Sequence, residues 1–136
     1  MMQTRKVAYS ILNHFDSLKE KIPVLLDQSF NKYSGILKKD RNRIIVSVNQ
    51  VIRFRGLLDH IIEKGSNRKI KHVNPKLRNI LRLGLYELLF DDMVPDFAAI
   101  HSSVELAKKN INKRSSSMVN AVMRNIQRLN DINDNW

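Results

Sequence analysis

Cationic side chains stand at three positions where the sequence pattern predicts that a helix begins. A helix N-terminus offers unpaired amides and a partial positive charge, so it binds phosphate well when basic side chains stand nearby. If the fold brings these ends together, they form one RNA-binding edge; ordinary solvated helix ends are the alternative. The candidate RNA-binding residues are Arg5 and Lys6, His72 and Lys76, and Lys113 and Arg114.

The overall charge favours a polyanionic partner. Lys and Arg total 24 against 13 Asp and Glu, which gives a net charge of +11. Such an imbalance in a small domain favours a nucleic acid or an anionic membrane surface as partner over a merely soluble basic protein. Positions 64–85 and 106–130 contain no acidic residue, whereas Glu87, Asp91, Asp92 and Asp96 cluster between them. We therefore expect a basic face.

Few residues are suited to catalysis. Cysteine is absent, which excludes disulfides, thiolate metal sites and cysteine nucleophiles. The four histidines lie on separate segments without the spacing of metal ligands, and four scattered glycines form no phosphate-binding loop. We expect no catalytic residue, no metal and no cofactor. Tyr9 lies off the apolar stripe of its predicted helix, beside Arg5 and Lys6, and is a candidate for stacking on bases.

The elements that position these residues are predicted to be helices throughout. Apolar residues recur at three- and four-residue spacing, and Pro23, Pro75 and Pro95 each precede such a run. The third helix begins near Asp40, which is a plausible N-cap, and a bend at Gly56 would divide it. The predicted helices cover about residues 4–15, 24–33, 40–65, 75–90, 97–111 and 118–129.

The helix that follows Asn74 and Pro75 is predicted to form the centre of the core. Its apolar arc is so wide that little of its surface is left for water. Gly84 in its middle costs about 1 kcal/mol in helix propensity, so we expect it to permit a close helix crossing. Phe15, Phe30, Phe90 and Phe97 fall on predicted inner stripes, and the central core residues are expected to be Leu81, Leu85, Leu88, Val119 and Val122.

One domain over residues 1–136, with its core at about 4–130, accounts for the whole pattern. No apolar run is long enough to span a membrane, and the N-terminus lacks the features of a secretory signal. We therefore expect a cytoplasmic protein without a membrane partner. The sequence distinguishes no interface stripe from the core stripes, so both a monomer and a homodimer are expected possibilities.

Five segments occur in order: RKVAYSIL, DRNRIIVSVNQVIRFRGLLDHII, LRNILRLGLYELLF, MVPDFAAIHSSVELAKK and SSSMVNAVMRNIQR. Together they resemble the NusB-like all-helical fold, a bundle of about six to seven helices. That fold is shared by the NusB transcription antitermination factor and the N-terminal domain of the RsmB ribosomal RNA cytosine-5 methyltransferases. In the antitermination branch, the resemblance implies RNA contacts at the N-terminal segment and at the loops into the fourth and sixth predicted helices. These positions carry the six candidate residues. Asn120 resembles a structural asparagine that hydrogen-bonds between helices.

The elements DRNR, VIR, LLD and VMRNIQR resemble the methyltransferase branch more closely, although Asn49-Gln50 and His101-Ser102 depart from both branches. The resemblance implies a non-catalytic domain that recognises ribosomal RNA beside a methyltransferase catalytic domain. Methylation in that family needs a cysteine nucleophile and a cofactor domain, which this chain lacks. The first alternative is an antitermination or termination factor that binds leader RNA with a ribosomal protein. The second is a helical protein-interaction or dimerisation module.

Overall fold

The computed structural model describes residues 2–132. Between these residues the chain forms seven α-helices and one short 3-10 helix, and no strand. The all-helical prediction is therefore confirmed. The helices group into two compact units, divided between Arg53 and Phe54. A single domain over residues 1–136 stays a prediction.

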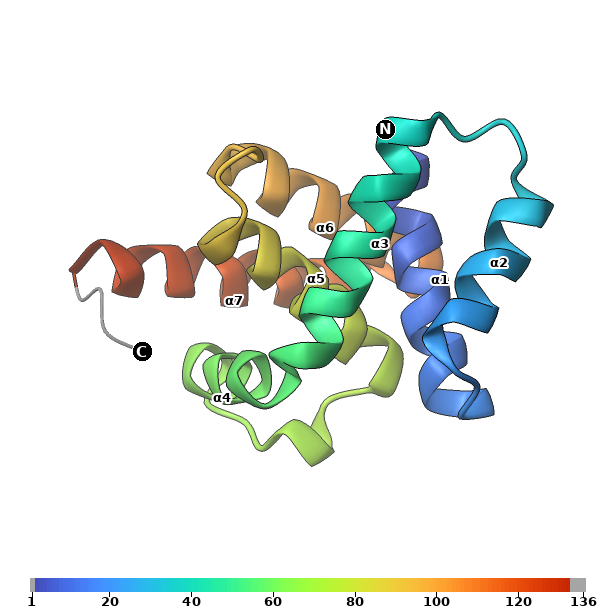
Figure 1. The fold of residues 1–136 in the computed structure, drawn as a ribbon. Helices are drawn as coiled ribbons and strands as arrows, with labels where there is room; N and C mark the ends of the chain where they lie inside the picture. Colours follow the sequence, from blue (N-terminus) through green and yellow to red (C-terminus); the bar gives the residue numbers. More distant parts are fainter. Residues whose placement is uncertain (1, 133–136) are drawn as a thin grey trace. The chain divides into compact units, whose positions relative to one another are not determined.

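The first unit contains three helices, α1 (Met2–Leu18), α2 (Ile22–Lys32) and α3 (Lys38–Arg53). Figure 1 shows them as the blue to blue-green part of the chain, and α1 packs against both α2 and α3. α3 begins at Lys38, so Asp40 lies inside the first turn and is not the N-cap that we predicted. Its carboxylate still favours the positive end of the helix dipole. The buried apolar side chains of this unit are Val7, Ala8, Tyr9, Ile11, Leu12, Leu25, Leu26, Ile44, Val48 and Val51.

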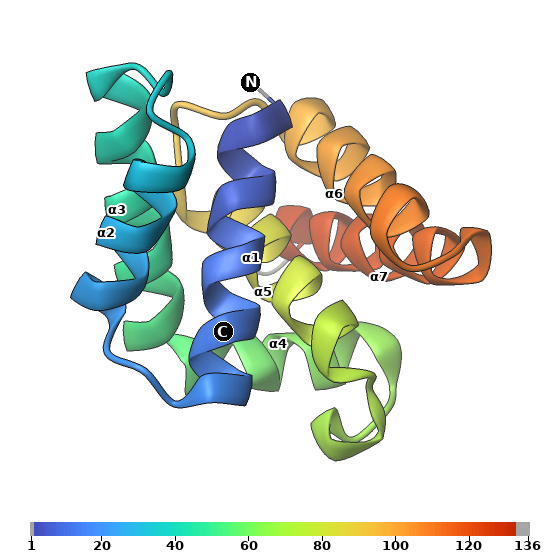
Figure 2. The same ribbon diagram turned by 90° about the vertical axis from the view of Figure 1, so that its right-hand side faces the viewer.

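The second unit contains α4 (Arg55–Ser66), the 3-10 helix η1 (Ile70–His72), α5 (Pro75–Phe90), α6 (Asp96–Asn110) and α7 (Lys113–Ile132). α5 lies at its centre and packs against α4, α6 and α7. Figures 1 and 2 show that the chain reverses from α5 to α6 and again from α6 to α7. α5 and α7 therefore begin toward the same end of this unit.

Asparagine side chains fix the two helix starts that matter for the candidate site. Asn74 caps α5 by accepting a hydrogen bond from the Lys76 amide (2.9 Å), with Pro75 as the first helical residue. This start agrees with the prediction. Asn112 accepts a hydrogen bond from the Ser115 amide (2.8 Å), so α7 begins at Lys113. The prediction that this helix starts only after the serines is wrong, because the asparagine cap precedes them.

Gly84 marks a close crossing of α5 with α6 and α7, as predicted. A Cβ atom at this position would overlap the Ser103 hydroxyl and would lie 3.0 Å from two atoms of the Met123 side chain. The core residues predicted around the crossing, Leu81, Leu85, Leu88, Val119 and Val122, are all buried.

Three other predictions about the helices are wrong. The third predicted helix does not bend at Gly56 but ends at Arg53, and a new helix begins after Phe54. Phe90 and Phe97 are 48% and 76% exposed instead of buried. Both flank the α5–α6 turn, outside the buried face of α6, which consists of Ala99, Ile100, Ser103, Leu106 and Ala107. The small residue Ser103 lies at the close crossing with α5.

Candidate nucleic-acid interface

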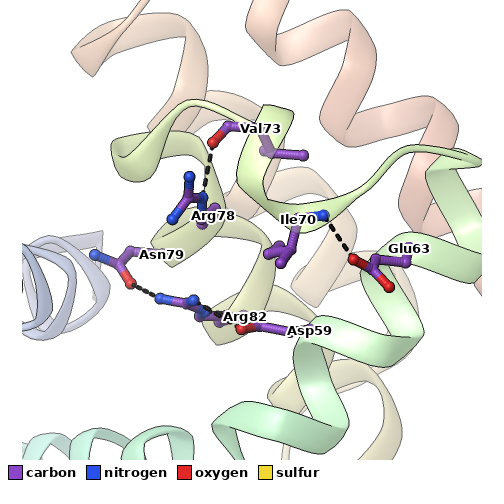
Figure 3. Close-up of polar contacts among 7 residues, drawn as sticks. All are labelled: Asp59, Glu63, Ile70, Val73, Arg78, Asn79 and Arg82. Carbon is purple, nitrogen blue, oxygen red and sulfur yellow. Dashed lines mark hydrogen bonds and ion pairs between the residues drawn. The ribbon is translucent and has the colours of Figure 1, made fainter.

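The connection between α4 and α5 is held in a defined conformation by hydrogen bonds from both flanking helices (Figure 3). A Glu63 carboxylate oxygen in α4 accepts a hydrogen bond from the Ile70 amide at 2.7 Å. From α5, Arg78 Nε donates to the Val73 carbonyl at 2.7 Å. Arg78 Nη2 also donates to the Lys71 carbonyl at 3.3 Å. The segment between the two helices therefore forms part of the fixed framework, which positions the cations that it carries.

Two of the candidate residues lie on this framework. His72 ends η1 and Lys76 is the second residue of α5, and both are exposed, as is Lys71 beside them. The amides of the α5 start contribute less to anion binding than we expected, because Pro75 has no N–H and the Lys76 amide is satisfied by Asn74. Any anion bound here is therefore held mainly by side chains.

Lys113 and Arg114 are the first two residues of α7, not residues that precede it, and both are exposed. The N-terminal end of a helix disfavours cations, and the first turn of α7 holds no acidic residue to offset them. The hydroxyls of Ser116 and Ser117 both donate to the Lys113 carbonyl, at 2.7 and 3.2 Å. The start of α7 therefore concentrates positive charge, and a bound anion would reduce the electrostatic repulsion there.

The candidate residues divide between the two units. His72, Lys76, Lys113 and Arg114 lie toward one end of the second unit, since α5 and α7 begin there. Arg5 and Lys6 lie in the first two turns of α1 in the first unit, where Arg5 is half-buried and Lys6 is exposed. The structure thus brings two of the three predicted helix starts to one end of a single compact unit.

Within the second unit, the cations at the starts of α5 and α7 lie at the end opposite the acidic α5–α6 turn. Lys108 and Lys109 in the last turn of α6 join the cations at the start of α7. Asp91, Asp92 and Asp96 lie at the opposite end, around the turn from α5 to α6. A Gln127 side chain near the end of α7 donates to Asp96 at 3.3 Å, which confirms that α6 and α7 run in opposite directions. An anion approaching this unit is therefore attracted to the end where α5 and α7 begin.

Arg82 is buried, although it belongs to the first stretch without acidic residues. Its side chain is 7% exposed, and the guanidinium forms a two-point ion pair with Asp59 of α4, with Nε–Oδ1 at 2.7 Å and Nη2–Oδ2 at 2.9 Å. Nη1 also donates to the Asn79 side chain at 3.0 Å (Figure 3).

Sequence reasoning missed the ion pair between Arg82 and Asp59. It also missed Glu63 and Arg78, the two residues that hold the α4–α5 connection. One signal in the sequence could have indicated the ion pair. Arg82 lies in a helix that is apolar all round, and a buried charge needs a partner.

The predictions about Tyr9 and Asn120 are also corrected. Tyr9 is 5% exposed, so it is a core residue and not a stacking platform for bases. Burial raises the pKa of its phenol above 10.0, and a hydrogen bond with Asn13 lowers it in part. Asn120 accepts a hydrogen bond from Arg124 within α7 (3.0 Å). The asparagine that joins two helices is instead Asn125, which donates to the Gly65 carbonyl of α4 at 2.9 Å.

The four histidines are exposed and lie on different elements. Among residues 2–132, no group of three histidine, aspartate or glutamate side chains is arranged to hold a metal ion. In that part of the chain, no helix is both long and apolar enough to cross a membrane.

Relatives in sequence carry two different names. A protein from Synechocystis sp. named probable ribosomal RNA small subunit methyltransferase B is 35% identical over 94% of this chain, yet the match spans only 28% of that relative. The transcription antitermination protein NusB of Ruminiclostridium cellulolyticum is 33% identical over 69% of this chain and 66% of its own length.

A solved structure and a family match identify the fold. The crystal structure of the antitermination factors NusB and NusE in complex with double-stranded RNA contains a chain with a TM-score of 0.85 and 25% identity. The superposition covers 94% of this chain and 96% of that one. Residues 2–128, nearly the whole chain, match the NusB family. The chain therefore belongs to the NusB family.

Proposed function

We propose that this chain is a non-catalytic RNA-binding domain whose interface includes the end of the second unit where α5 and α7 begin. The observation that carries the proposal is the placement of exposed His72, Lys76, Lys113 and Arg114 at this one end, opposite the acidic α5–α6 turn. Arg5 and Lys6 of α1 are proposed as further contacts. The solved complex of NusB and NusE with double-stranded RNA, which contains a chain of the same fold, supports this assignment.

Within this function, we propose that the domain recognises ribosomal RNA for a methyltransferase. The support is the Synechocystis relative, which is 35% identical across 94% of this chain and extends well beyond the matched region. The methyltransferase catalytic domain is the partner that this reading requires.

The second candidate is an antitermination factor that binds leader RNA together with a ribosomal protein. It is favoured by the Ruminiclostridium relative and by the solved complex of NusB with NusE. Affinities for ribosomal and leader RNA fragments, each measured with and without a NusE-type protein, separate the two. Tighter binding to leader RNA only when that protein is present would favour antitermination, whereas binding to ribosomal RNA without it favours the methyltransferase role.

A charge-reversal variant tests the RNA interface itself. We expect Lys113→Glu with Arg114→Glu to leave the fold intact, because both side chains are exposed. It should weaken RNA binding by more than about tenfold, since it replaces two positive charges by two negative ones that repel the phosphates. Fluorescence anisotropy with a labelled ribosomal RNA hairpin measures the change.

Lys38→Glu with Lys39→Glu is the matched control. These two lysines are also adjacent, exposed and placed in the first turn of a helix, but they belong to α3 and are not among the proposed contacts. The control should change the affinity by less than about threefold. If Lys113→Glu with Arg114→Glu binds RNA as the unmodified chain does, the start of α7 is not part of the site.

A further inference from the structure

The outer face of α7 carries a continuous basic surface beyond the helix start. At about 100° per residue, six residues of α7 fall within an arc of about 100°, and all six are exposed. Positions 113–130 contain no acidic residue. We call this set the α7 stripe, and its members are Lys113, Arg114, Ser117, Ala121, Arg124 and Arg128.

The two arginines at the far end of the α7 stripe are held in place by neighbouring amides. Arg124 Nε donates to Asn120 Oδ1 at 3.0 Å, and Arg128 Nη2 donates to Asn125 Oδ1 at 2.6 Å. Asn125 is itself anchored to the Gly65 carbonyl of α4. Among the described residues, these are the only hydrogen bonds of the two guanidiniums. The other N–H donors of each guanidinium therefore remain for an external acceptor.

The dimensions of the α7 stripe suit a nucleic-acid backbone. From Lys113 to Arg128 the helix advances about 22 Å. The small side chains of Ser117 and Ala121 lie between the two cationic pairs, so a strand can approach the helix closely there. Arginine is the cation best shaped for phosphate, because its planar guanidinium can form two parallel hydrogen bonds with phosphate oxygens.

We propose that the α7 stripe is a phosphate track along which the backbone of bound RNA continues from the start of α7 to Arg128. This inference rests on the proposed function and extends its site by Arg124 and Arg128. The contacts are to sugar and phosphate, so they position the RNA without reading its sequence. The track predicts a longer RNA footprint than the helix starts alone would give.

Arg124→Gln with Arg128→Gln tests the track. The side chains are exposed and glutamine is a good helix former, so the fold should persist, which circular dichroism checks. Binding to an RNA hairpin with a stem long enough to cover about 22 Å should weaken about tenfold at 200 mM salt. The slope of log affinity against log salt should become shallower by about 1.4–1.8, the value for two lost phosphate contacts. Arg124→Lys with Arg128→Lys should restore the slope, because the charge returns.

Lys38→Gln with Lys39→Gln removes the same charge from the other unit and serves as the control. It should leave the slope unchanged and the affinity within about twofold. The track is overturned if this control and Arg124→Gln with Arg128→Gln weaken binding equally, since the effect then comes from net charge alone. It is also overturned if the arginine variant binds as the unmodified chain does while Lys113→Glu with Arg114→Glu binds weakly; the proposed function then survives. If the unmodified chain fails to bind RNA, the proposed function and the track fall together.

Discussion

At the scale of single residues, the structure separates cations that support the fold from cations that face solvent. Arg82 and Arg78 stand in the same acid-free stretch as Lys71 and Lys76. Yet Arg82 is buried against Asp59, and Arg78 holds backbone carbonyls of the α4–α5 connection. From sequence alone, the four cations look alike. Arg82 differs because of its partner Asp59, which lies 23 positions away in the chain.

Asp59→Asn should therefore destabilise the protein. It removes the Asp59 charge from the two-point ion pair with the buried Arg82 side chain, which costs about 3 kcal/mol, near the lower end of the range for such pairs, because the Asp59 side chain is 21% exposed. Urea denaturation measures the free energy of unfolding, and Asp92→Asn, at an exposed carboxylate, should change it by less than about 0.5 kcal/mol. Replacing both partners, with Asp59→Leu and Arg82→Met, should recover most of the loss. Equal stability of Asp59→Asn and the unmodified chain would show that the pair does not support the fold.

Tyr9 supplies a pH-dependent contribution to stability. Its folded-state pKa is raised above 10.0, mainly by burial, so the folded state binds the phenolic proton more tightly than the unfolded state does. This contribution is fully present below the unfolded pKa and is lost as the pH rises through the folded pKa. Between about pH 9 and pH 11, the unmodified chain should therefore lose more unfolding free energy than Tyr9→Phe. Tyr33→Phe, at an exposed tyrosine, should follow the unmodified chain; identical losses in all three proteins would mean that Tyr9 titrates as an exposed phenol.

At the scale of elements, the start of α5 was predictable, whereas the starts of α3 and α7 and the break before α4 were not. Asn74-Pro75 is a local signal, and it fixed the start of α5 because the cap and the proline act within a few residues. The break at Phe54 has no proline or glycine at the break itself, and the predictive signal, Gly56, lies two positions later. The inner face of α6 was misjudged because the largest apolar residue, Phe97, was expected inside. The close crossing at Gly84 instead selects small side chains, such as Ser103.

Gly84→Ala tests this crossing. The added methyl group would meet the Ser103 hydroxyl, which is buried and hydrogen-bonded to the Ala99 carbonyl at 2.7 Å, and would crowd Met123. We expect a loss of about 1–3 kcal/mol in the free energy of unfolding, as for other overpacked cores. Gly56→Ala is the matched control, because nothing lies within 4 Å of its added Cβ, and it should stabilise by about 0.5 kcal/mol. A Gly84→Ala variant as stable as Gly56→Ala would contradict the close packing of α5, α6 and α7.

At the scale of the whole molecule, the excess of positive charge was predictable from composition, and the all-helical class was predictable from the spacing of apolar residues. The NusB-like fold was indicated by the resemblance of five segments. Net charge follows from counting, and a helical stripe repeats often enough to reveal the core of α5. The arrangement of the candidate site was harder to predict from the sequence. That the starts of α5 and α7 share one end depends on two chain reversals, and the α7 stripe becomes visible only once exposed positions such as Arg124 and Arg128 are known.

The central claim is that this NusB-family chain binds RNA through phosphate contacts on cationic side chains. The most direct measurement is a fluorescence-anisotropy titration of the unmodified chain against a ribosomal RNA hairpin and a DNA hairpin of matched sequence, at about 50 and 200 mM salt. We predict tighter binding to RNA than to DNA, and a log–log salt slope of about −0.7 to −0.9 for each phosphate contacted. No binding to RNA at the lower salt concentration, or binding that salt does not weaken, would contradict the claim.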